Sequence, residues 1–192
     1  ESAEAVKGQG KTALDRVLTK AAYTARVGAS RGGQGARVFR PVPKSTIVKL
    51  DEIVWSSDGK PQTVEVFEME DLSELWSAEG TGSVKYDGPA LEPGEYAVQL
   101  EGKYFDFVIA DAKQTALLEG ALADVKTAQE SLRRQGVTDS ATLIALPASV
   151  YLHAGMPTEG LKLVDDALKQ NPGDKALLNL RDQLEAKCAI KR

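Results

Sequence analysis

The chain has 192 residues, 27% of them charged, and a formal net charge of −4, values that fit one or two globular domains and exclude a wholly disordered or collagen-like chain. It contains one cysteine, Cys188, and one histidine, His153, so an internal disulfide and a Cys/His zinc cluster are both excluded. No apolar run is long enough to cross a bilayer, and we expect no membrane span.

Charge is distributed unevenly along the chain. Residues 1–40 carry eight Lys or Arg against three Asp or Glu, residues 41–113 carry six against fifteen, and residues 114–192 carry ten against ten. Together with a change in hydrophobic periodicity, these shifts divide the chain into three parts. We expect an N-terminal helix and a Gly-rich basic linker at 1–40, a β domain at 41–111 and a helical domain at 112–192.

Apolar residues recur at helical spacing between residues 11 and 29, which predicts a short amphipathic helix. A Gly-rich stretch at 28–35 follows and is typical of a linker. The segment Gly10-Lys11-Thr12 lacks both the first glycine and the preceding strand of a phosphate-binding loop, so we do not expect nucleotide binding. The apolar positions of the predicted helix are Leu14, Val17, Leu18, Ala21 and Ala22.

The basic residues of this first part suggest a nucleic-acid or anionic-lipid site as one alternative. However, Tyr23 is the only aromatic residue in 1–37 that could stack on a base, and the β part that follows is acidic and would repel a polyanion. We therefore expect no nucleic-acid partner. The basic arm is expected either to lie on the acidic β part, of the same or a neighbouring molecule, or to remain a solvated linker. Its cations are Arg16, Lys20, Arg26, Arg31, Arg37 and Arg40.

Short alternating segments separated by turn signals occupy the middle of the chain, as in antiparallel sandwiches. Trp55 and Tyr96 are expected in the core of this sandwich. An immunoglobulin-type disulfide is excluded, so the class is immunoglobulin-like or fibronectin-like. The seven predicted strands are 45–50, 52–56, 62–69, 75–78, 83–86, 95–100 and 103–109.

Three segments of this middle part also resemble the sandwich modules of bacterial envelope proteins. They are Glu52-Ile53-Val54-Trp55, Val64-Glu65-Val66-Phe67 and Leu91-Glu92-Pro93-Gly94-Glu95-Tyr96. The last has a clear mechanism, because Pro-Gly forms a tight turn and the tyrosine then begins a strand facing the core.

Helical periodicity follows, and predicts helices over 113–135, 139–154, 157–170 and 175–189. Residues 139–172 within it resemble one tetratricopeptide repeat, a helix–turn–helix unit whose small residues let two helices approach closely. Pro147 replaces the usual leucine of that pattern and Gly160 the usual alanine. The matching positions are Ile144, Ala148, Tyr151, Gly155, Val164, Ala167, Leu168 and Pro172.

A single unit cannot bury its apolar face alone, so the helices at 113–135 and 175–189 are the expected neighbours. The resemblance implies that the first helix of the unit lines a groove for a peptide or a partner helix. Alternatively, these side chains simply pack on the helix at 113–135. The groove residues implied are Thr142, Ala145, Ser149, Leu152 and His153.

Catalytic chemistry has little support in the sequence. His153 is the only possible base of a Ser-His-Asp triad, and no serine has a nucleophile-elbow context. The carboxylates around 68–74 alternate with other residues as on a solvated face, and calcium binding by Glu68, Glu70, Asp71 and Glu74 lacks the spacing of an EF-hand loop. We therefore expect no enzyme activity, no cofactor and no metal site.

The sequence thus predicts a multi-domain all-β plus all-α chain: a seven-stranded antiparallel β-sandwich followed by a four-helix segment like a tetratricopeptide repeat. By analogy we expect a non-enzymatic protein-binding or scaffolding protein of the bacterial cell envelope, periplasmic or extracellular, with a protein or peptide partner. The alternative is a sensor or regulatory domain that binds a small ligand or ion at the sandwich–helix junction. The sequence does not determine the oligomeric state.

Overall fold

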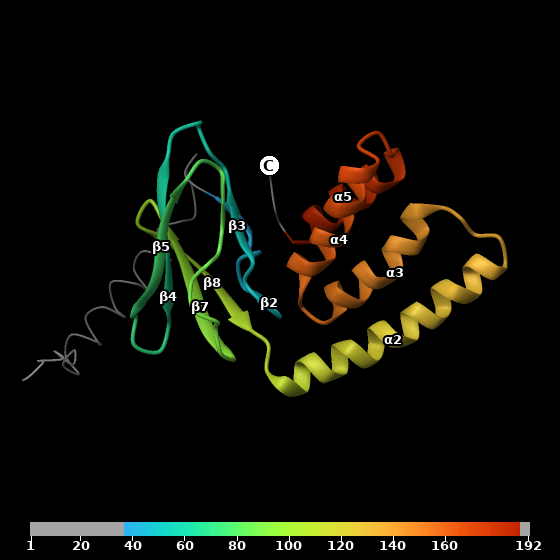
Figure 1. Ribbon diagram of the computed structural model, residues 1–192, viewed down its shortest axis with the longest axis horizontal. Helices are drawn as coiled ribbons and strands as arrows, with labels where there is room; N and C mark the ends of the chain where they lie inside the picture. Colours follow the sequence, from blue (N-terminus) through green and yellow to red (C-terminus); the bar gives the residue numbers. More distant parts are fainter. Residues whose placement is uncertain (1–36, 189–192) are drawn as a thin grey trace, which may run out of the picture.

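The computed structural model describes residues 37–188, which form eight strands followed by four helices (Figure 1). The predicted order of an all-β part before an all-α part is confirmed. The helix predicted at 11–29 lies outside the described residues. The strands are β1 (Val38–Arg40), β2 (Ser45–Ile47), β3 (Glu52–Trp55), β4 (Gln62–Glu68), β5 (Glu74–Gly80), β6 (Ser83–Lys85), β7 (Gly94–Leu100) and β8 (Lys103–Ile109). The helices are α2 (Ala112–Arg134), α3 (Ser140–His153), α4 (Pro157–Gln170) and α5 (Lys175–Lys187).

Strand β1 lies within the range that the sequence assigned to the linker, so the described residues hold one strand more than the seven expected. Its three residues are too few to show alternation, and Pro41 follows directly. It is nevertheless a strand, because Val38 pairs with Trp55 of β3 in an antiparallel register and is buried.

The strands form a three-stranded sheet in the order β1-β3-β6 and a five-stranded sheet in the order β2-β8-β7-β4-β5. One pair departs from the expected antiparallel arrangement, because β2 runs parallel to β8 with Ser45 opposite Phe107. A long stretch of chain separates these two strands, so no hairpin imposes an antiparallel direction on them.

One hydrophobic core joins the two sheets. Trp55 and Tyr96 are each 3% exposed, which confirms their predicted place in the core. Alternate residues of β4 and β7, such as Val64 and Val98, are fully buried, whereas their neighbours point to the other side. The Tyr96 hydroxyl donates to the Glu92 carbonyl, which fixes the turn before β7.

Each helix begins or ends at a residue that the sequence marks. Asp111, Asp139 and Asp174 accept hydrogen bonds from backbone N–H groups at the starts of α2, α3 and α5. Gly136 and Gly155 follow α2 and α3 with positive φ angles of 89° and 74°, which glycine adopts without strain.

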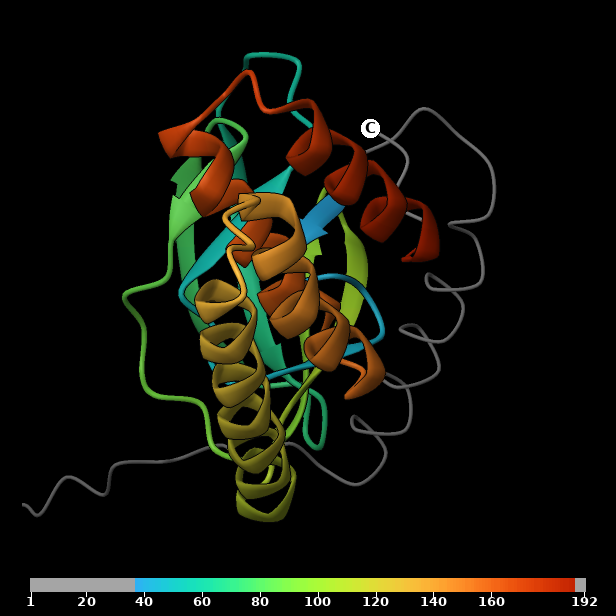
Figure 2. The same cartoon turned by 90° about the vertical axis from the view of Figure 1, so that its right-hand side faces the viewer.

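The helices lie on one side of the two sheets, with β4 and β5 on the opposite side (Figure 1). The view turned by 90° shows α2 and α3 side by side, and α4 and α5 pack against α3 and against each other (Figure 2). Helices α3 and α4 approach closely. A Cβ atom added to Gly160 would lie only 3.1 Å from the Ala148 carbonyl oxygen. Within residues 37–188, no helix combines the length and apolar character needed to cross a membrane.

Candidate functional site

Helix α2 is the most exposed, relative to its length, of the four helices between residues 37 and 188. It has 23 residues, and Leu118 is the only buried one. Leu118 packs with Ala110 and Met156, at the end of α2 nearest the sheets. The rest of its apolar stripe is only partly covered by α3, and Leu117 remains 68% exposed. An apolar stripe left partly uncovered along an amphipathic helix indicates a face without a full neighbour among the described residues.

That face forms one wall of an open groove of about 620 Å³, and α3 forms the other wall. The lining is mainly aliphatic, and its polar side chains are those of Gln114, Ser149 and His153. The His153 Nδ1 atom lies 2.8 Å from the Ser149 carbonyl oxygen, so part of its polar capacity is used within α3. The apolar lining consists of Leu117, Leu118, Ala121, Val125, Leu146, Val150, Ala154 and Met156.

The two walls are held together by an unusual hydrogen bond. Pro147 lies inside α3 and has no N–H group to donate to the carbonyl of Leu143, one turn earlier. The side chain of Gln129, on α2, donates to that carbonyl instead, over 2.5 Å. The proline that departs from the repeat pattern therefore leaves the Leu143 carbonyl free to accept the bond that ties α2 to α3, and α3 continues through the proline.

Of the five groove residues implied by the resemblance, two line the groove in the structure and three lie elsewhere. Ser149 and His153 line the groove, both exposed. Leu152 instead packs against the hydrophobic core of the helices. Thr142 is exposed at the start of α3, where its N–H bonds to the Asp139 carboxylate, and Ala145 is half-buried outside the groove.

Half of the groove is formed by α2, a helix that we expected from the sequence only as a packing neighbour of the repeat-like unit. Leu117, Leu118, Ala121 and Val125 belong to the helical stripe that the sequence shows. The length of α2 could have indicated this, because a 23-residue helix cannot be covered along its whole length by the 14-residue α3. An uncovered apolar stretch was therefore to be expected on α2.

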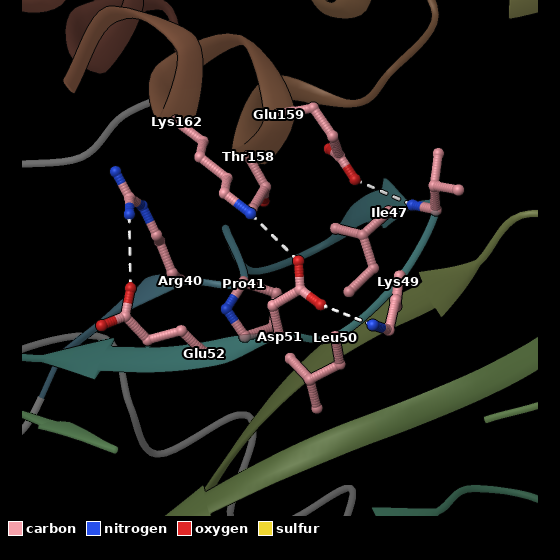
Figure 3. A pocket seen from close by; sticks show the side chains of 11 residues that line it. Arg40, Pro41, Ile47, Lys49, Leu50, Asp51, Glu52, Thr158, Glu159 and Lys162 are labelled. Atoms are coloured by element: carbon pink, nitrogen blue, oxygen red, sulfur yellow. Dashed lines mark hydrogen bonds and ion pairs between the residues drawn. The ribbon is translucent and has the colours of Figure 1, made fainter. Parts of the chain in front are cut away.

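A second concave site lies where α4 meets the segment between β1 and β3 (Figure 3). Backbone groups of the β part bond directly to the start of this helix. The Val42 N–H donates to Thr158 Oγ1 over 2.9 Å, and the Val48 N–H donates to Glu159 Oε1 over 2.8 Å. The cavity between them is small, about 150 Å³.

Glu159 is the most perturbed acid of this junction. Burial raises its pKa to about 7, an effect only partly opposed by the Val48 N–H and by Lys162. Its second oxygen, Oε2, is buried and has no hydrogen-bond partner among the described residues. At neutral pH this carboxyl is therefore poised between its neutral and charged forms.

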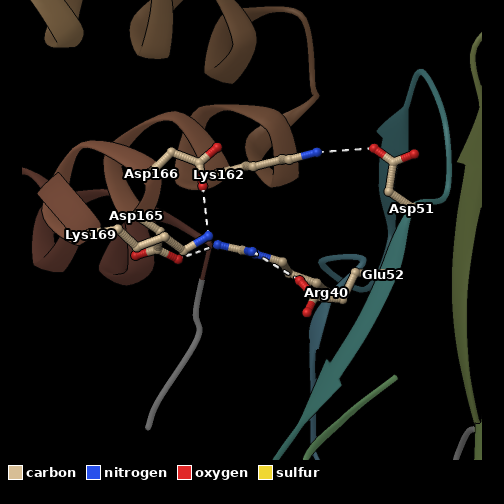
Figure 4. A network of polar contacts seen from close by, with 7 residues as sticks. All are labelled: Arg40, Asp51, Glu52, Lys162, Asp165, Asp166 and Lys169. Carbon is tan, nitrogen blue, oxygen red and sulfur yellow. Dashed lines mark hydrogen bonds and ion pairs between the residues drawn. The ribbon is translucent and has the colours of Figure 1, made fainter. Parts of the chain in front are cut away.

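Ion pairs surround this contact on the solvent side (Figure 4). Arg40, from β1, bonds to Asp165 of α4 and also lies 3.5 Å from Glu52. The Lys162 ammonium, one turn earlier on α4, lies 3.0 Å from the Asp51 carboxylate. The side chains of Arg40 and Asp165 are 15% and 19% exposed, whereas those of Lys162 and Asp51 are 49% and 45% exposed, so water screens the second pair much more.

Among residues 37–188, no three His, Cys, Asp or Glu side chains are grouped in a way that could hold a metal ion. The acidic residues around 68–74, weighed above as a calcium site, belong to this described part. Comparison with known proteins gives no assignment either: no protein-family model matches the chain, and no curated protein matches it significantly.

Proposed function

We propose that this chain is a non-enzymatic binding or scaffolding protein, and that the groove between α2 and α3 binds a helical segment of another protein. The observation that supports this most strongly is the exposed apolar wall of α2, with Leu117 at 68% exposure. Burying such a leucine contributes roughly 1.5–3 kcal/mol, which a partner would gain on binding.

The lining favours a helix over an extended peptide. A strand brings unpaired N–H and carbonyl groups, and Gln114, Ser149 and His153 are too few to satisfy them. A helix satisfies its own backbone and presents apolar side chains at positions i, i+3, i+4 and i+7. The partner we propose is therefore an amphipathic helix with aliphatic or aromatic residues at those positions.

The resemblance of residues 139–172 to a tetratricopeptide repeat supports the same kind of partner. We propose that α3 and α4 are the two helices of one tetratricopeptide-like unit, with α5 as its cap. In stacked helical hairpins each helix contacts neighbours on both sides. A helix placed before α2 would then pack against α2 and α3 together, which is where the groove lies. We take the two sheets, with their shared core, as an immunoglobulin-like sandwich that carries this unit.

We also propose a location in a bacterial envelope, periplasmic or extracellular, because the segments around Trp55 and Tyr96 resemble the sandwich modules of bacterial envelope proteins. The alternative, a sensor that binds a small ligand or ion at the sandwich–helix junction, has a weaker geometric basis. The cavity there, about 150 Å³, is below the roughly 300–1,000 Å³ of most ligand pockets.

A selection experiment tests the proposal. A display library of helical peptides, varied at the apolar positions i, i+3, i+4 and i+7, is selected on the full chain, and the affinities of the selected peptides are measured. The same peptides are then measured on the Leu117→Glu variant. Since Leu117 is exposed, the variant should fold normally and lose most of the affinity.

The matched control is Glu119→Lys, a charge change at an exposed position of α2 that does not line the groove. Its affinities should stay close to those of the original chain. Equal affinity for the original chain and for Leu117→Glu would place the binding elsewhere and contradict the proposal.

A further inference from the structure

The two sheets differ in what covers their outward faces. The outward side of the three-stranded sheet is turned toward the helices, and Phe39, Val54 and Ser83 line a cavity there together with Leu161 and Arg181. The five-stranded sheet turns its outward side away from α3, α4 and α5 (Figure 1). That outward side is not used by the proposed function.

This outward side is acidic. The outward positions of β4, β5, β7 and β8 contain no Lys or Arg. Glu74, Glu79 and Glu95 are exposed on it, and Glu65 is half-buried. Burial raises the pKa of Glu65, and the nearby charge of Glu74 raises it further. A cation docked on this side would relieve that repulsion.

The same side has an apolar centre. Phe67 and Tyr104 form an edge-to-face ring pair with centroids 5.6 Å apart. Ala97 lies opposite Phe67 in the register and is fully buried, although its position points outward. Val108 lies on the same face of β8 as Tyr104, and Asp106, opposite Ala97 in the register, lies between them, so the strip includes one acid. An occupant of this surface would therefore need both apolar side chains and positive charge.

We propose that this outward side of the five-stranded sheet, centred on Phe67 and Tyr104 and ringed by Glu65, Glu79 and Glu95, is the docking surface for the chain's own basic segment, residues 11–31. The segment carries five Lys or Arg against the single acid Asp15. Its apolar residues recur at helical spacing, as described above, and match the apolar strip. The complementarity is thus of charge and of apolar contact together.

The dimensions allow the contact within one molecule. A 19-residue helix over 11–29 is about 28 Å long. Seven-residue strands such as β4 and β7 are about 23 Å long, and five strands are about 19 Å across. The five residues 32–36 span up to about 17 Å, whereas packed sheets are about 10 Å apart. Because β1 is an edge strand, the chain can pass round that edge.

Carbodiimide cross-linking of the full chain tests the proposal, because it joins only amines and carboxylates in direct contact. The amines of Lys11 and Lys20 should couple to Glu65, Glu79 and Glu95 several-fold more than to Glu119 and Glu130, which are exposed on α2. Coupling to all five carboxylates alike would overturn the proposal, as would no coupling to the sheet.

Mixing chains of natural isotope content with ¹⁵N-labelled chains separates contact within one molecule from contact between two. Cross-linked peptide pairs of a single isotope content are the expected result, and pairs of mixed content would assign the contact to a neighbouring copy and overturn the proposal. In the Glu65→Lys/Glu95→Lys variant, coupling to Glu79 should fall several-fold. The Glu119→Lys/Glu130→Lys control should leave it unchanged, and an equal fall in both variants would also overturn the proposal.

Discussion

The Gln129 side chain on α2 donates a hydrogen bond to the Leu143 carbonyl on α3, over 2.5 Å. Within α3 this carbonyl would ordinarily accept from residue 147, which is proline. The bond therefore replaces one that the helix cannot make and joins the two walls of the proposed groove. This bond thus adds a polar contact to the packing that holds α2 on α3.

Replacing Gln129 by alanine should lower the free energy of unfolding by about 1–3 kcal/mol, because the half-buried carbonyl loses its donor. In a Pro147→Ala background the residue 147 N–H can donate instead, so the same substitution should cost less than about 1 kcal/mol. Urea unfolding of the four chains completes this cycle. Equal costs in both backgrounds would show that Pro147 and Gln129 are not coupled.

Two helical glycines provide a matched pair for the packing of α3 on α4. Leucine at Gly160 would push a side chain against the Ala148 carbonyl, whereas a Cβ atom at Gly120 meets nothing within 4 Å. Gly160→Leu should therefore destabilise the chain by about 1–3 kcal/mol. Gly120→Leu should be neutral or stabilise it by up to about 1 kcal/mol, since leucine is a better helix former. Thermal unfolding of both variants compares them, and equal effects would contradict the close approach.

The junction should make stability depend on pH through Glu159. Its pKa is about 7 in the folded chain, against 4.5 as the ordinary value. The folded chain therefore binds a proton that the unfolded chain has released between these values. Stability from this group is complete below pH 4.5, falls as pH rises to 7 and is constant above, a loss of up to about 3 kcal/mol.

Glu159→Gln should remove that fall, because the amide oxygen can still accept from the Val48 N–H and cannot ionise. Urea unfolding between pH 4 and about 8 measures the slope. Thr158→Val is the control: it removes the acceptor of the Val42 N–H in the same interface but no titrating group. It should cost stability and keep the slope, and an unchanged slope in Glu159→Gln would refute the assignment.

The ion pairs at the junction should contribute unequally. Asp165→Asn breaks the more buried pair with Arg40 and should cost about 1.5–3 kcal/mol. Asp51→Asn breaks the exposed pairs with Lys162 and Lys49 and should cost less than about 1 kcal/mol. Unfolding at low and high salt distinguishes the two, because added salt should reduce mainly the cost of Asp51→Asn. A larger cost for Asp51→Asn would contradict the burial argument.

The elements that the sequence predicted well are those with a repeated local pattern. The strand from 62 and the turn before Tyr96 show alternation and turn chemistry within a few residues. Strand β1 has too few residues for a pattern and depends on pairing with β3, and the parallel pairing of β2 with β8 is also non-local. Neither contact leaves a signal in the neighbouring sequence.

The candidate groove was predicted only in part for a similar reason. Helical spacing placed Ser149 and His153 on the face of α3 that lines the groove beside α2. It could not show that Leu152 turns to the core of the helices, because that depends on where α4 and α5 lie. The exposure of Leu117 likewise follows from the short length of α3, which cannot cover the whole of α2.

Methyl NMR of the full chain, titrated with a peptide selected as described above, tests most directly whether a partner binds between α2 and α3. The methyl signals of Leu117, Val125 and Val150, in the groove, should shift together and saturate. Those of Ile47 and Leu50, at the junction, should stay in place. Shifts confined to Ile47 and Leu50, with the groove signals unchanged, would contradict the claim that the chain binds partners between α2 and α3.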